Sequence, residues 1–221
     1  MNRFWQIMMM SGGLWVTFFG WQEYRVSQLA RPEAADVSLL ELEKLEVGGV
    51  NQLVENAHVR FGPCLALYPA TVYSFRVNGV FGTGESGPNT AVKDAFVPIL
   101  PLDHPLVKAL QNPDSSEARR GMTLNDIKFH VLLKTNQIEL VRDIPRENRQ
   151  LNQVQGVIIN DIRPLKAEEE DLLQVNFRRL KPEQVIIVEE GRIPWGARSI
   201  WALLGLGGGL FLVGGWLFFS R

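Results

Sequence analysis

The sequence predicts an α+β protein, in which a mixed or antiparallel sheet with short helices is flanked by two transmembrane α-helices. Three observations predict this fold class. Uncharged apolar runs lie near both ends of the 221 residues. Segments of alternating apolar and polar residues, typical of half-buried strands, lie between them. Capping residues and acidic first turns mark short helices among these strands.

The two apolar runs have the length of membrane spans. Residues 4–21 and 200–219 carry no formal charge. As helices they would extend about 27 and 30 Å, close to the thickness of a hydrocarbon core. We therefore predict transmembrane helices over 4–21 and 199–219. A cleaved signal peptide is the alternative for the first run, and a buried glycine-rich core helix is the alternative for the second.

Aromatic and cationic residues flank both runs, as expected where a helix meets lipid headgroups. The predicted membrane-interface residues are Trp5, Trp21, Trp195, Trp216 and Arg198. Two crossings place both termini on one side of the membrane and the domain on the other. A short basic start before an apolar run favours cytosolic termini and a non-cytosolic domain, although the arginines next to the domain favour the reverse.

Small residues predict close helix packing in the membrane. Gly205 and Gly209 form a GxxxG spacing, and Gly13 and Thr17 share a face of the first helix. Such positions let a neighbouring backbone approach closely. We expect the two helices to pack on each other or on a partner.

Residues 22–198 form one predicted soluble α+β domain, beginning with a helix and a hairpin. Ser38 and Glu41 form a capping box before a leucine-bearing helix that Gly48 ends. Residues 71–77 alternate as a strand, and Asn78-Gly79 predicts a tight turn. Residues 95–100 form an apolar run that Pro98 and Pro101 limit to an edge strand or a strand end.

The second half of the domain has a stronger strand signal. Asp103 is the expected cap of a short helix, and residues 127–134 alternate as a half-buried strand. Residues 154–162 and 184–189 are further strands. Between them, residues 165–177 predict a helix whose acidic first turn complements the helix dipole.

Composition excludes several classes of protein. Lys and Arg number 23 against 24 Asp and Glu, so the chain lacks the basic excess that nucleic-acid binding needs. The single cysteine, Cys64, excludes an internal disulfide and stands among apolar neighbours that predict a buried, inert thiol.

The residues around each candidate reactive motif argue against a functional site. Residues 82–87 fit G-x-G-x-x-G, but no helix follows to hold a pyrophosphate. His58, His104 and His130 lack the spacing of metal ligands. Glu168 to Asp171 are consecutive, so in a helix they cannot all converge on one ion. We therefore predict no catalytic residue, no metal ligand and no cofactor.

Two segments carry a resemblance to a known group. SLLELEKLEVGGVNQLVENAHVRF and QGVIINDIRPLKAEEEDLLQVNF resemble segments of uncharacterised bacterial two-pass membrane proteins. The plan of a domain between two anchors is also similar to that of the Surfeit-1 family of cytochrome oxidase assembly factors and of a mitochondrial membrane ubiquitin ligase. The bacterial resemblance implies a bacterial inner-membrane protein and no known activity.

The functional expectation is an assembly, scaffolding or accessory module for a membrane-associated partner. The expected partners are the lipid bilayer and another membrane protein or a second copy of the chain, with no nucleic acid. The alternatives are a membrane-anchored enzyme whose site assembles from distant residues, and a small transporter or channel component.

Overall fold

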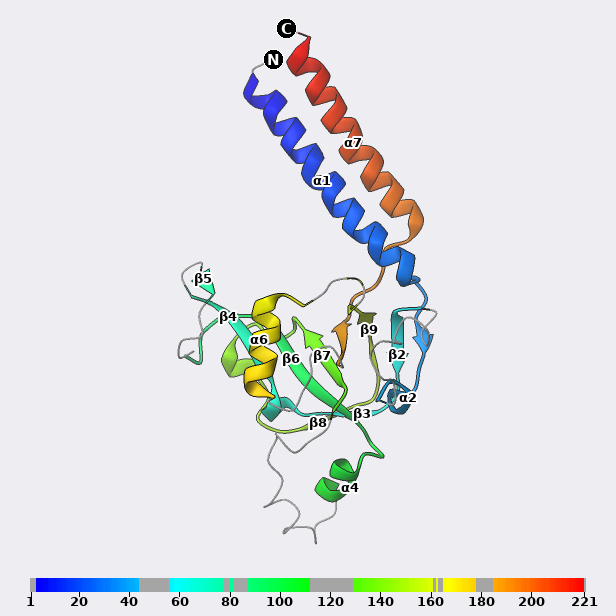
Figure 1. The fold of residues 1–221 in the computed structure, drawn as a ribbon, viewed down its shortest axis with the longest axis vertical. Coiled ribbons are helices and arrows are strands. Elements are labelled where there is room, and N and C mark those ends of the chain that lie inside the picture. The colour runs from blue at the N-terminus through cyan, green and yellow to red at the C-terminus, as the bar shows by residue number, and fades with distance from the viewer. Residues whose placement is uncertain are drawn as a thin grey trace. The chain divides into compact units, whose positions relative to one another are not determined.

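The structure, a computed structural model, describes residues 3–43, 56–77, 80–81, 87–111, 129–160, 162, 165–177 and 185–220 (Figure 1). The chain divides into two compact units, residues 1–33 with 193–221, and residues 34–192. The first unit is a pair of long helices, α1 (Arg3–Leu29) and α7 (Ala197–Phe219). The second unit is α+β with a mixed sheet and short helices, which confirms the predicted class of the domain.

Within its described residues, the second unit contains strands, three short α-helices and two 3-10 turns. In chain order these are β1 (Ala35–Asp36), α2 (Leu39–Glu43), β2 (His58–Phe61), β3 (Cys64–Ala66), η1 (Tyr68–Ala70), β4 (Val72–Val77), β5 (Val80–Phe81), β6 (Val92–Pro101), α4 (Pro105–Gln111), β7 (Val131–Thr135), η3 (Val141–Asp143), β8 (Arg149–Leu151), β9 (Val154–Ile158), α6 (Ala167–Asn176) and β10 (Ile186–Glu190).

The sheet runs in the order β1-β2-β9-β10-β7-β6-β3-β8, and β4 pairs with both β6 and β5. The β1–β2 and β10–β7 pairs are parallel, and the others are antiparallel. Two residues separate β2 from β3, and two separate β8 from β9, although these strands lie far apart in the sheet order. The path therefore returns on itself, and the sheet curls like a small barrel.

Side chains from one face of the curled sheet fill its interior. Every second residue of each strand points inward. The interior cluster consists of Leu39, Leu42, Val59, Phe61, Cys64, Ala66, Val97, Ile99, Val131, Leu133, Val154, Ile158, Ile186 and Val188. Leu39 and Leu42 come from α2, which packs against this core. The backbone N–H of Ser38 donates to the Glu41 carboxylate, which is one of the two hydrogen bonds of the predicted capping box. The predicted helix end at Gly48 lies outside the described residues.

Of the two alternatives for residues 95–100, the edge strand is wrong, whereas the strand end agrees with β6, which ends at Pro101. β6 lies inside the sheet, with β7 on one side and β3 and β4 on the other. The oxygen of Pro98 accepts a hydrogen bond from the Leu67 N–H, at the point where η1 interrupts the strands on that side. Because the nitrogen and oxygen of one strand residue face the same neighbour, the missing N–H of Pro98 faces this interruption. Proline therefore breaks no ladder bond there.

Two further predictions need correction. β7 is buried along its whole length rather than half-buried, because α6 covers the outer face of this part of the sheet (Figure 1). The cap of α4 is His104, not Asp103, since His104 Nδ1 accepts a hydrogen bond from Leu106 N at 3.2 Å. The predicted Asn78-Gly79 turn lies outside the described residues, although β4 and β5 on either side of it pair antiparallel.

One of the two long helices has the composition of a membrane span. Among the described helices, α7 is the one that is long and apolar enough to cross a membrane. α1 has 27 residues, which is ample length, but it falls short in apolar character. The predicted span over residues 4–21 therefore stays a prediction.

Candidate functional site

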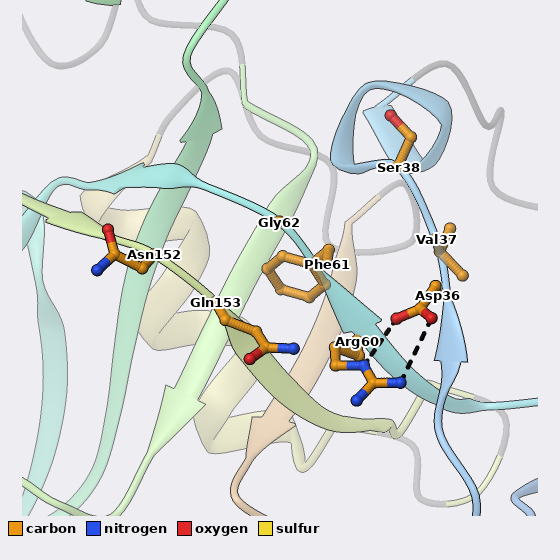
Figure 2. Close-up of a pocket in the computed structure, with 8 residues that line it drawn as sticks. All are labelled: Asp36, Val37, Ser38, Arg60, Phe61, Gly62, Asn152 and Gln153. Carbon is orange, nitrogen blue, oxygen red and sulfur yellow. Dashed lines mark hydrogen bonds and ion pairs between the residues drawn. The ribbon is translucent and has the colours of Figure 1, made fainter.

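An open groove lies at the corner where β2 passes into β3 and β8 passes into β9. Its volume is about 490 Å³. The groove is lined by Asp36, Val37, Ser38, Arg60, Phe61, Gly62, Asn152 and Gln153 (Figure 2). Three segments that are distant in sequence meet here, because β2 pairs with β1 on one side and with β9 on the other.

The groove has charged and amide groups around a small apolar floor. The Arg60 guanidinium binds the Asp36 carboxylate through two hydrogen bonds of 2.7 and 3.3 Å (Figure 2). Asn152 and Gln153 are exposed, whereas the Phe61 ring is buried. The paired charges cancel, so the groove presents donors and acceptors without net charge. This chemistry suits a polar, uncharged segment such as an extended peptide backbone.

A buried ionic cluster joins α6 to the sheet. Lys134 Nζ lies 2.9 Å from Asp94 Oδ1 and 2.9 Å from Glu169 Oε1. The side chains of Lys134 and Glu169 are 8% and 6% exposed. The Lys134 ammonium also stands over the Phe96 ring, 5.3 Å from its centroid. The cluster is packed beneath α6, which indicates a role in holding the helix on the sheet.

The surroundings of Glu169 lower the pKa of its carboxyl group. Burial acts to raise this pKa, but a hydrogen bond from the Lys166 backbone N–H and the contact with Lys134 outweigh burial. Glu169 therefore keeps its charge below the usual glutamate range. Glu168, Glu170 and Asp171 are exposed, so the four consecutive acids point in different directions.

Because this pKa is lowered in the folded chain, the free energy of unfolding depends on pH. A carboxyl with a lower pKa in the folded chain stabilises the fold above its unfolded pKa of about 4.5, and this stability is lost as pH falls through the folded pKa. We expect Glu169→Gln to flatten the loss of unfolding free energy below about pH 4.5. The measurement is denaturant unfolding in mild detergent, followed by circular dichroism. Glu168→Gln, on the same helical turn, is the control and should keep the wild-type slope; equal slopes in all three proteins would refute the assignment.

Cys64 and the histidines take structural positions. Cys64 is fully buried inside the curled sheet, and burial followed by the nearby Glu190 carboxylate raises the pKa of its thiol to about 12. His58 is also fully buried, with its Nε2 2.9 Å from Gln155 Nε2. His130 precedes β7, and its backbone oxygen accepts a hydrogen bond from Ile186. In the described part of the chain, no three His, Cys, Asp or Glu side chains converge as metal ligands would.

α1 and α7 lie side by side (Figure 1), and they pack through a seven-residue glycine repeat. Gly13 and Gly20 are buried on α1, and Gly207 and Gly214 are buried on α7. A Cβ atom on Gly207 would lie 2.5 Å from Thr17 Oγ1 and 2.7 Å from Thr17 N. A spacing of seven keeps a contact seam on one side of a helix over several turns.

The predicted packing residues divide between two surfaces. Gly13 and Thr17 lie in the α1–α7 contact, whereas Gly205 and Gly209 would meet no atom within 4 Å if each gained a Cβ. Two residues turn a helix by about 200°, so these two glycines face away from the seam that holds Gly207. Packing of Gly205 and Gly209 on a partner stays a prediction. The signal that sequence reasoning missed is the seven-residue repeat present in both helices.

Aromatic side chains cluster at one end of the helix pair. The Trp21 ring stacks on Tyr24 at 5.5 Å, Tyr24 meets Trp201 at 5.9 Å, and Phe19 meets Trp195 at 5.9 Å. Arg198, in the first turn of α7, is exposed at this same end, and Trp5 and Trp216 are exposed at the other end. These are the positions that the membrane-interface prediction names.

Fold and geometry together define a chain with a mixed-sheet domain and a unit of two paired long helices, of which α7 is apolar enough to cross a membrane. No known protein family, curated protein or solved structure matches this chain. The resemblance to bacterial two-pass membrane proteins therefore rests on the two quoted segments alone.

Proposed function

We propose that the protein is a two-pass bacterial inner-membrane protein whose α+β domain docks onto a membrane-associated partner, as an assembly, scaffolding or accessory module. The observation that carries this proposal is the outward face of the helix pair. Trp15 of α1 and Leu212 and Trp216 of α7 are each more than 70% exposed. Apolar surface of this extent is covered by lipid or by protein in a cell.

The dimensions of the helices support two crossings. α1 and α7 have 27 and 23 residues, or about 40 and 35 Å, which exceeds a hydrocarbon core of about 30 Å. The charges of α1, at Arg3, Glu23 and Arg25, lie at its ends, outside residues 4–21. In this arrangement both termini lie on one side of the membrane and the domain lies on the other, which we place on the non-cytosolic side.

The groove supports the docking role of the domain. It is open, its amide and ionic groups are exposed, and it lies beside β1, a two-residue strand at one end of the sheet order. Strands at a sheet edge can accept an extended peptide, with backbone hydrogen bonds giving affinity and neighbouring side chains giving specificity. The occupant that we propose is an uncharged extended segment of the partner protein.

A paired crosslinking experiment tests this function in intact membranes. A photoreactive residue replaces Gln153 in the groove or, as a matched control, Gln174, an exposed glutamine of α6. We expect a discrete heterologous crosslink from position 153 and none from position 174. Gln153→Arg should weaken co-purification of the same partner in mild detergent, whereas Gln174→Arg should not. Crosslinks of equal yield at both positions, or a chain that remains alone, would contradict the docking role.

A further inference from the structure

We infer that α1 is a conditional membrane span, which crosses a bilayer only while α7 covers one of its faces. This inference rests on the proposed function, since it assumes that the chain is a membrane protein. It explains why α7 has the apolar character of an independent span and α1 does not.

The two faces of α1 differ sharply in polarity. The face toward α7 carries Gln6, Gly13 and Gly20, which are buried. The outward face carries large apolar side chains that are about half exposed or more, namely Phe4, Trp5, Ile7, Met8, Leu14, Trp15, Phe18, Phe19 and Trp21. The most polar side chain within residues 4–21, Gln6, is thus one that α7 shields, whereas Ser11 is exposed and its hydroxyl donates to Met8 O within α1. With α7 in place, the surface left for lipid is almost wholly apolar.

Gln6 is the residue of α1 for which shielding from lipid by α7 matters most. Gln6 is 2% exposed, and its Nε2 donates a hydrogen bond to the Leu217 backbone oxygen on α7 at 2.9 Å. Without α7 this amide, next to the predicted interface residue Trp5, would have to find a partner among the headgroups or stay unpaired in hydrocarbon, where an unpaired amide is costly. Thr17 does not depend on α7 in this way, because its hydroxyl donates to Gly13 O within α1 at 2.9 Å.

The cover depends on the close approach of the two backbones. Gly207 lies against Thr17 N and Gly13 O, which an added Cβ would meet at 2.7 and 2.9 Å. Both are backbone atoms, so no side-chain rotation can relieve the contact. A larger residue at 207 must therefore push α1 away from α7. A larger residue at Gly209 meets open space, which makes it a matched control.

The test follows both termini of the full-length chain in sealed membrane vesicles. Each terminus carries a short epitope, and protease protection reports its side after an alkaline carbonate wash. In the wild type both epitopes should lie on the same side, and Gly209→Leu should leave this unchanged. Gly207→Leu should stay in the membrane through α7, while its N-terminal epitope moves to the domain's side in most chains. Gln6→Leu combined with Gly207→Leu should restore the wild-type arrangement, because α1 then has no amide to shield.

The outcomes separate the two proposals. Release of the wild type by carbonate would overturn the membrane function itself. Wild-type topology in Gly207→Leu would show that α1 crosses unaided and would overturn the inference alone. If Gln6→Leu failed to restore the topology of Gly207→Leu, the inference would also be overturned. The crossing of α1 would then depend on α7 for a reason other than the shielding of its polar face.

Discussion

Replacing Lys134 by methionine is expected to lower the free energy of unfolding of the domain by about 3–5 kcal/mol. The ammonium group lies between the carboxylates of Asp94 and Glu169, at 2.9 Å from each. Removing one partner of a buried ion pair leaves the remaining charges in a medium that solvates them poorly. The free energy of unfolding of a typical domain is about 5–15 kcal/mol, so the expected loss is a large fraction of it.

The chain contains its own control and its own probe for this measurement. Lys108 is also paired, with Asp103 at 3.8 Å, but both side chains are exposed. Lys108→Met should therefore cost less than about 1 kcal/mol. Unfolding can be followed by reaction of Cys64 with a thiol reagent, because the one cysteine of the chain is fully buried in the domain core. Equal losses for the two lysine variants would mean that the buried cluster contributes no more than a surface pair.

Local patterns in the sequence were sufficient to locate most of the strands and helices. Alternating apolar residues predict β4 and β7, and further strands are predicted where β9 and β10 lie, although β9 ends at Ile158 rather than at residue 162. The capping box at Ser38 predicts the start of α2, and the acidic first turn predicts α6. These signals are local, since they depend on neighbours within a few residues along the chain.

Long-range pairing was beyond the reach of these patterns. Pro98 indicated an edge strand because the sequence does not show that η1 lies opposite it. In the predicted strand over residues 127–134, Lys134 suggested that one face is exposed to solvent. Leu132 lies on the same face and was a sign that another element covers it. The groove brings together residues near 37, 61 and 152, and only the pairing of β2 with β1 and with β9 makes them neighbours. None of these long-range contacts produces a periodic pattern of residues that could be recognised in a single sequence.

Gly156→Ala is the second substitution with a large expected effect, about 3 kcal/mol of lost stability or more. Gly156 lies in β9, paired with Val59 on one side and with Glu190 on the other. An added Cβ would lie 2.9 Å from the carbonyl carbon of Glu189 and 2.9 Å from Val188 Cγ1, and would overlap the Glu189 oxygen. Two of these atoms belong to the backbone of β10, so the methyl group can fit only if the β9–β10 pairing shifts.

The matched control for Gly156→Ala is Gly62→Ala, at the corner between β2 and β3. A Cβ on Gly62 would meet no atom within 4 Å, and its φ is not in the left-handed region. This substitution should leave stability unchanged or raise it by up to about 1 kcal/mol, by reducing the freedom of the unfolded chain. Both variants can be compared by Cys64 labelling in denaturant. Equal stability of Gly156→Ala and Gly62→Ala would contradict this prediction. It would mean that β9 and β10 do not approach closely at Gly156, because their close pairing leaves no space for an alanine methyl.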